Sequence, residues 1–149
     1  MIDLGIDVSK AKLHTALHRE ADGKTKLKTK VIENRPAGVS ALIDWLARQG
    51  LAPTAVHAVL EATGVYHETT AEALYAHGVT VSIVNPAQAK KFAQGLAVRT
   101  KTDAVDADAD ADAETLARFG ALVRPAPWTP PPHLAGVAGA STGAQRGSP

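Results

Sequence analysis

The chain contains no cysteine among its 149 residues. This absence excludes disulfide bonds, thiolate zinc sites and a cysteine nucleophile, so any metal ion must be held by oxygen or imidazole ligands. The six histidines show no HxH or HExxH spacing, and a zinc site therefore has little support. No apolar run approaches bilayer length, and the first residues do not read as a secretion signal. We therefore expect a cytoplasmic protein with no membrane partner.

The charges are balanced in number but unevenly distributed along the chain. The net charge is +1, yet residues 88–101 contain four cations and no acid, whereas residues 103–114 contain acids and no base. A basic segment beside a carboxylate cluster is what a metal-dependent enzyme acting on a polyanion needs. Two solvated charge blocks would give the same pattern.

Hydrophobic periodicity predicts three strands followed by alternating helices and strands. The first strand, residues 2–8, places Asp7 on the face opposite its isoleucines. Such an order implies a mixed α/β sheet with helices on its faces, as in the ribonuclease-H-like fold. The other expected strands cover residues 12–18, 24–33, 54–60 and 79–84, and the expected helices cover 36–50, 68–76, a segment starting at 85–86, and 114–122.

Residues 1–123 are predicted to form one domain. The prolines between Pro125 and Pro132 cannot continue a helix or enter the centre of a sheet. Residues 135–149 are small and glycine-rich without hydrophobic period, so residues 124–149 are expected to form a disordered Pro/Gly-rich tail. Trp45 and Trp128 are expected to pack rather than to stack on bases.

Four acids are candidates for a metal site. Asp7 and Glu61 each end a predicted strand, and these two strands can be neighbours in a mixed sheet. Carboxylates crowded together need a hard cation such as magnesium. Asp103 and Asp106 are spaced i, i+3, which places both on one face of a helix. Taken singly, such acids are often caps, turn formers or solvated groups.

Three segments together resemble the signature of insertion-sequence transposases with an N-terminal DEDD domain, which is similar to the Holliday-junction resolvase RuvC. These segments are GIDVSK at residues 5–10, LEATG at 60–64 and KTDAVDA at 101–107, and the resemblance covers roughly residues 1–134. It implies a RuvC-like fold and a catalytic quartet that binds Mg²⁺ or Mn²⁺ and cleaves or joins DNA phosphodiesters. The quartet implied by the resemblance is Asp7, Glu61, Asp103 and Asp106.

The resemblance also implies partners for the chain. These are DNA, in some members a structured bridge RNA that guides the reaction, and a homo-oligomer of the full-length protein. Thr63 and Gly64 resemble motif neighbours that support the ligands or touch phosphate. The candidate nucleic-acid-binding residues are Lys10, Lys90, Lys91, Arg99 and Lys101.

A run of alternating lysines is a further candidate for contact with nucleic acid. Lys24, Lys26, Lys28 and Lys30 alternate with other residues, which predicts that all four point to one face of a strand. Such a stripe could follow a phosphate backbone. A soluble sheet face or a protected sheet edge would show the same pattern.

The acidic motif departs from the family pattern. Residues 108–112 form an Ala-Asp insert, after which Asp112 recreates the family's DAxxLA motif and competes with Asp106. Asp112 lies six positions after Asp106, and six residues are not a whole number of helical turns. The insert therefore cannot keep both the acidic pair and the following helix in register. We favour Asp106 because it keeps the DxxD spacing with Asp103.

Family members continue into a second domain with a catalytic serine, and the change in composition after Leu134 indicates a frameshift or a degraded gene. We therefore expect this chain not to be competent for transposition alone. Two other functions are open. An actin-like ATPase or sugar kinase also begins with a Gly-Ile-Asp strand, although residues 8–10 match its phosphate turn poorly. A non-catalytic nucleic-acid-binding remnant is the second alternative.

Overall fold

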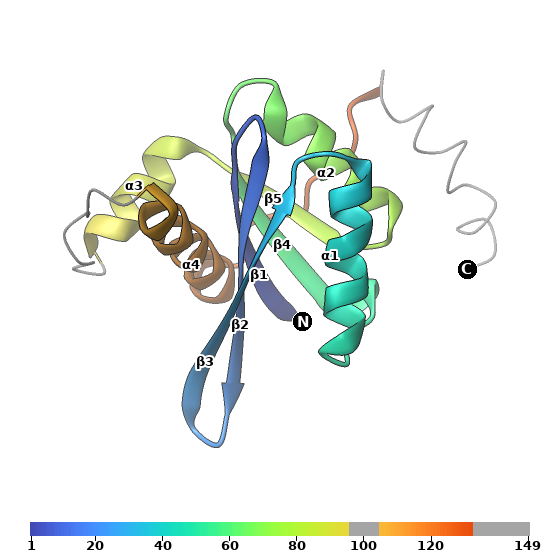
Figure 1. The fold of residues 1–149 in the computed structure, drawn as a ribbon. Helices are drawn as coiled ribbons and strands as arrows, with labels where there is room; N and C mark the ends of the chain where they lie inside the picture. Colours follow the sequence, from blue (N-terminus) through green and yellow to red (C-terminus); the bar gives the residue numbers. More distant parts are fainter. Residues whose placement is uncertain (96–104, 133–149) are drawn as a thin grey trace.

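The fold is a mixed five-stranded sheet with helices on both faces (Figure 1). The computed structural model describes residues 1–95 and 105–132, without the side chains of residue 21 and of residues 105–108. The strand order is β3-β2-β1-β4-β5, with β2 antiparallel to both of its neighbours and β4 parallel to both of its own. The strands are β1 (Ile2–Val8), β2 (Lys12–Ala21), β3 (Lys24–Glu33), β4 (Val56–Glu61) and β5 (Thr80–Val84).

The helices form one layer on each face of the sheet. Side chains of α1 and α2 join the larger core cluster on one face, which we call the α1/α2 face. Side chains of α3 and α4 form a second cluster on the other face, the α3/α4 face. The helices are α1 (Pro36–Arg48), α2 (Tyr66–Ala76), α3 (Pro86–Gly95) and α4 (Val105–Val123), and a single 3-10 turn, η1 (Pro53–Ala55), precedes β4.

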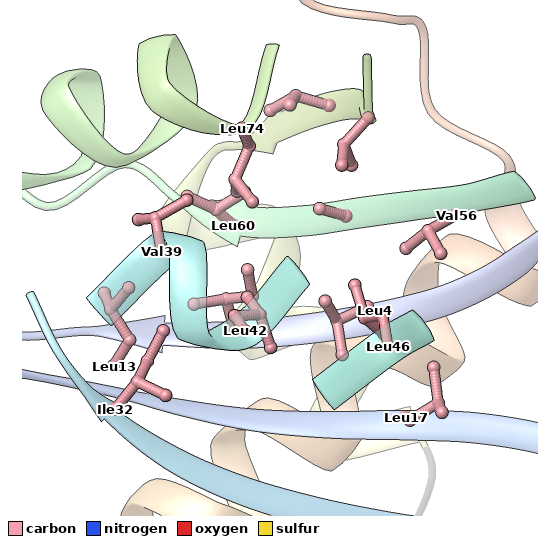
Figure 2. Close-up of a cluster of buried hydrophobic side chains, with 14 of the residues drawn as sticks. Leu4, Leu13, Leu17, Ile32, Val39, Leu42, Leu46, Val56, Leu60 and Leu74 are labelled. Atoms are coloured by element: carbon pink, nitrogen blue, oxygen red, sulfur yellow. The ribbon is translucent and has the colours of Figure 1, made fainter. Parts of the chain in front are cut away.

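The larger core lies between the sheet and α1 (Figure 2). Every second residue of β1 from Leu4 onward is buried, as the alternation in the sequence predicts. On α1, Val39, Leu42 and Leu46 recur at helical spacing and are at most 2% exposed. Burying one such side chain fully contributes about 1.5–3 kcal/mol. The apolar pattern of β1 and α1 therefore decides which face of the sheet α1 covers.

On the α3/α4 face, α4 packs directly on the backbone of β1. A Cβ atom at Gly5 would overlap the carbonyl oxygen of Ala113. At Gly120 a Cβ atom would lie 3.1 Å from Asp3 Oδ1. Later residues of α4 thus lie beside earlier residues of β1, so the helix runs antiparallel to the strand. The N-terminal half of α4 consequently lies toward the end of β1 that carries Asp7.

The main difference from the predicted elements is the start of α4. The sequence predicts a last helix over residues 114–122, but α4 begins at Val105. The Ala-Asp repeat is therefore the N-terminal half of this helix rather than a segment before it. Alanine is the best helix former, and Ala109 and Ala113 are buried. β2 also extends beyond its predicted end, to Ala21, whereas β3 has its predicted bounds.

The chain after α4 lies against β5. The backbone N–H of Trp128 donates to the carbonyl oxygen of Val81 at 2.6 Å, and its ring meets Tyr75 edge to face with centroids 5.9 Å apart. The predicted packing of Trp128 and Trp45 is confirmed. The domain boundary at residue 123 stays a prediction, and residues 133–149 of the predicted tail lie outside the described residues. Within the described part of the chain, no helix has both the length and the apolar character needed to span a membrane.

A chain of polar contacts holds this last segment to the sheet. His57 Nδ1 lies 2.9 Å from Asp3 Oδ1, and His57 Nε2 lies 2.8 Å from Ser82 Oγ. The Ser82 hydroxyl donates to the carbonyl oxygens of Pro125 and Ala126. Ser82 is fully buried. These contacts link β1, β4 and β5 to the segment after α4, and we infer a structural role for the three side chains.

The Ser82→Ala variant is expected to lower the free energy of unfolding by about 1–3 kcal/mol, because a ring nitrogen of His57 and two carbonyl oxygens lose their shared partner. Urea denaturation followed by circular dichroism measures this loss. The matched control is Ser40→Ala, which removes an exposed hydroxyl from α1 and should change the free energy by less than about 0.5 kcal/mol. Equal stability of the two variants would contradict the structural role.

Candidate functional site

Asp7 and Glu61 come together at one edge of the sheet. Ile6 pairs with Leu60 in the parallel register of β1 and β4, and Asp7 and Glu61 each follow that pair by one residue. Because side chains alternate along strands, both acids project from the same face. Val59 lies on that face and packs in the α3/α4 cluster. We call this position, on the α3/α4 face at the ends of β1 and β4, the carboxylate edge.

The helix α4 brings a second pair of acids beside the carboxylate edge. Asp110 Oδ1 lies 3.2 Å from Nδ1 of His14, and His14 pairs with Asp7 in the antiparallel register of β1 and β2. Asp112 instead lines a cavity of about 410 Å³ together with Glu61. The two acids of α4 thus lie on either side of β1, Asp110 toward β2 and Asp112 toward β4. Both directions follow from the packing of Ala109 and Ala113 against the sheet.

The structure describes only the backbone of Asp106 and no part of Asp103. Asp103 lies outside the described residues, and so do Arg99 and Lys101. The backbone of Asp106 lies in the first turn of α4, about 6 Å before Asp110 along the helix axis, but its side chain is not described.

Three of the candidate nucleic-acid-binding residues lie in the described part of the chain, and all three are exposed. Lys10 is exposed in the connection that follows β1. Lys90 and Lys91 are exposed on α3, and Lys90 lines the cavity that contains Glu61 and Asp112. The cavity therefore combines two acids with one cation. A phosphate could approach the acids along this basic side of the edge.

The chemistry of the site fits a hard cation such as Mg²⁺. Its acids offer carboxylate oxygens, which are the ligands that Mg²⁺ and Mn²⁺ prefer. The hydroxyl of Thr63, two residues after Glu61, is buried and has no hydrogen-bond partner among the described residues. Buried hydroxyl groups in folded proteins are usually hydrogen-bonded, so this group has capacity for a further polar partner. Among residues 1–95 and 105–132, no three side chains that could hold a metal ion lie together.

Sequence reasoning did not find the contact between His14 and Asp110. No spacing in the sequence marks His14 as the partner of an acid, and the local sequence does not show how the Ala-Asp repeat is oriented. One feature of the sequence could have indicated the position of His14. The short connection between the first two strands sets their register, and this register places His14 beside Asp7.

Comparison with known sequences identifies relatives over most of the chain. Residues 4–127 match the family model of the DEDD domain of IS110 transposases. Two pilin gene-inverting proteins, from Moraxella bovis and Moraxella lacunata, are each 37% identical over 97 residues, which make up 65% of this chain. The aligned part spans 28% of the length of these relatives.

Comparison with solved structures identifies the fold. RuvC of Thermus thermophilus superimposes with a TM-score of 0.54 at 18% identity, covering 86% of this chain and all of RuvC. The same protein in complex with a Holliday junction substrate gives a TM-score of 0.53 at 17% identity, covering 86% of this chain and 99% of RuvC. The predicted fold is confirmed as a RuvC-like member of the ribonuclease-H-like fold.

Proposed function

The chain belongs to the IS110 DEDD transposase family, and from this membership we propose that it is the catalytic DEDD domain of a DNA transposase, which cuts or joins phosphodiesters with divalent metal. The observation that carries the proposal is the adjacent placement of Asp7 and Glu61 on one face at the ends of β1 and β4. These are the first two acids of the predicted quartet. The ribonuclease-H-like fold supports it further.

We propose that Asp7, Glu61, Asp103 and Asp106 hold the metal. The antiparallel course of α4 over β1 supports the inclusion of Asp106, because its backbone lies toward the Asp7 end of the strand. Asp112 is the alternative to Asp106, and its support is the cavity that it shares with Glu61. When bound, Mg²⁺ or Mn²⁺ would supply an activated hydroxyl and charge stabilisation for the leaving oxygen.

The chain's own residues would orient the substrate at the carboxylate edge. Lys10 on one side and Lys90 and Lys91 on the other attract the DNA backbone toward the acids. Arg99 and Lys101 belong to the same proposed surface. His14 holds Asp110 by its 3.2 Å contact and thereby steadies α4, the helix that carries Asp106 and Asp112.

Family membership decides against the actin-like ATPase or sugar kinase. A non-catalytic nucleic-acid-binding remnant stays the second candidate. The Ala-Asp insert places the start of the DAxxLA motif, Asp112, six positions after Asp106. We also propose, from the family resemblance, a structured guide RNA, a homo-oligomer of the full-length protein and a cytoplasmic location.

Removal of divalent metal tests the catalytic proposal. Although the chain is not expected to complete transposition alone, its DEDD domain is expected to nick supercoiled plasmid DNA with Mg²⁺ or Mn²⁺ present. Excess EDTA should reduce the rate by at least about a hundredfold, because it removes the metal that activates the attacking hydroxyl and stabilises the leaving oxygen. Gel separation of nicked from supercoiled DNA measures the rate. Binding to DNA in EDTA without nicking in either metal would favour the non-catalytic alternative.

A further inference from the structure

The alternating lysines of β3 form a basic strip on the face of the sheet opposite the carboxylate edge. Lys28 pairs with Leu17 in the β2–β3 register, and Leu17 belongs to the core on the α1/α2 face. Asp7 instead pairs with His14, which pairs with Val31. Side chains of Asp7 and of the lysines therefore project from opposite faces. The strip consists of Lys24, Lys26, Lys28 and Lys30, with Arg19 of β2 paired to Lys26.

The cations of this basic strip are not neutralised by neighbouring acids. Lys24, Lys26 and Lys28 are exposed, and Lys30 is half-buried. Lys28 Nζ donates to the side-chain oxygen of Gln49, a neutral group, and Arg19 donates to the backbone carbonyl of the same residue. None of the five cations forms a salt bridge with another residue of the described chain. Their positive charge is thus available to an external partner.

The strip occupies sheet positions that hold core residues elsewhere. On the same face of β2 and β3, Leu13, Leu17 and Ile32 are buried beneath α1. Lysine takes the other inward positions on this face of β3, where Lys24, Lys26 and Lys28 stay exposed and Lys30 is half-buried. In Figure 1 the β2–β3 hairpin extends beyond the helices that cover the rest of the sheet. Lysine side chains also protect edge strands, and here four of them follow one another on one face of β3.

We propose that this basic strip is a second nucleic-acid-binding surface, which contacts the backbone of double-stranded DNA away from the carboxylate edge. Alternate residues of a strand are about 6.8 Å apart, so the lysines form a straight row of about 20 Å. Duplex DNA carries one negative charge per roughly 1.7 Å of helix axis, so a row of this length always meets phosphates. The choice of DNA rests on the proposed function.

A duplex fits this surface better than a single strand. Proteins that bind single strands combine a basic groove with aromatic side chains on which the bases stack. The strands β2 and β3 contain no phenylalanine, tyrosine or tryptophan. Contacts from the strip would therefore reach phosphates and not bases. Such contacts fix the position of a duplex without reading its sequence.

The sharpest test moves the charge from one face of β3 to the other without changing the composition. The face-swap variant combines Lys26→Thr and Lys28→Thr with Thr25→Lys and Thr29→Lys, and both threonines are exposed on the α3/α4 face. Binding of a labelled duplex of about 20 base pairs is measured by fluorescence anisotropy in EDTA over a series of salt concentrations. The plot of the logarithm of the association constant against the logarithm of the salt concentration should have a slope about 1.8 less negative. Kd near 0.1 M salt should rise about tenfold.

The controls separate this proposal from the proposed function. Thermal unfolding checks that the face swap still folds, and Lys26→Gln with Lys28→Gln provides a second variant with the same expected loss. Unchanged slopes and Kd values in both variants would overturn the proposal. So would a loss restricted to single-stranded DNA or to an RNA hairpin of equal length. Because EDTA suppresses metal-dependent chemistry, a failure of plasmid nicking leaves this result unaffected.

Discussion

The Asp7→Asn variant is expected to nick plasmid DNA at least about a hundredfold more slowly than the unmodified chain. Asparagine keeps the shape of the side chain but removes the negative charge that a divalent ion needs. A metal ion contributes several kcal/mol of transition-state stabilisation, and each 1.36 kcal/mol corresponds to a tenfold rate. Initial nicking rates at a fixed Mg²⁺ concentration measure the effect.

The matched control for this variant is Asp44→Asn. Asp44 is exposed on α1, which covers the opposite face of the sheet, so its loss should leave the rate within about threefold. A nicking rate for Asp7→Asn as high as that of the control would refute a catalytic carboxylate edge. The same assay decides between Asp106 and Asp112, because the true ligand should reproduce the loss seen for Asp7.

Local patterns account for most of the fold that the sequence predicts. The alternation in β1 and the i, i+3, i+4, i+7 spacing in α1 report burial directly, and both elements have nearly their predicted bounds. The Ala-Asp repeat carries no such pattern, because alanine is small enough to pack against a strand or to face solvent. Its burial at Ala109 and Ala113 depends on Gly5, more than a hundred residues earlier. The early start of α4 could therefore not be read from the local sequence.

One part of the candidate site could be predicted from the local sequence, and another part depends on tertiary contacts. The adjacency of Asp7 and Glu61 was predictable, because both acids end strands that a mixed sheet can place side by side. The separate directions of Asp110 and Asp112 were not, since they depend on how α4 is rotated about its axis over β1. That rotation is set by tertiary contacts with Gly5 and Val59. The packing of α4 on β1 is thus the structural condition on which the acids of this helix depend.

The Gly5→Ala variant tests that condition and is expected to lower the free energy of unfolding by about 2–3 kcal/mol. The added methyl group would overlap the carbonyl oxygen of Ala113 and lie 2.5 Å from the backbone nitrogen of Ala117. Both are backbone atoms, so no side-chain rotation relieves the clash and the whole helix must move, an overpacking cost of about 1–3 kcal/mol. Urea denaturation of the purified variant measures the loss.

The control for Gly5→Ala makes the same chemical change where the methyl group has room. At Gly95, the last residue of α3, an added Cβ has no neighbour within 4 Å among the residues that the structure describes, so Gly95→Ala should be neutral or stabilising by up to about 1 kcal/mol. Displacement of α4 by Gly5→Ala should also slow plasmid nicking, because the proposed ligand Asp106 and its alternative Asp112 move relative to Asp7 and Glu61. Equal stability and equal activity of Gly5→Ala and Gly95→Ala would contradict the packing of α4 on β1. The position of the α4 acids beside the carboxylate edge would then have no support from this packing.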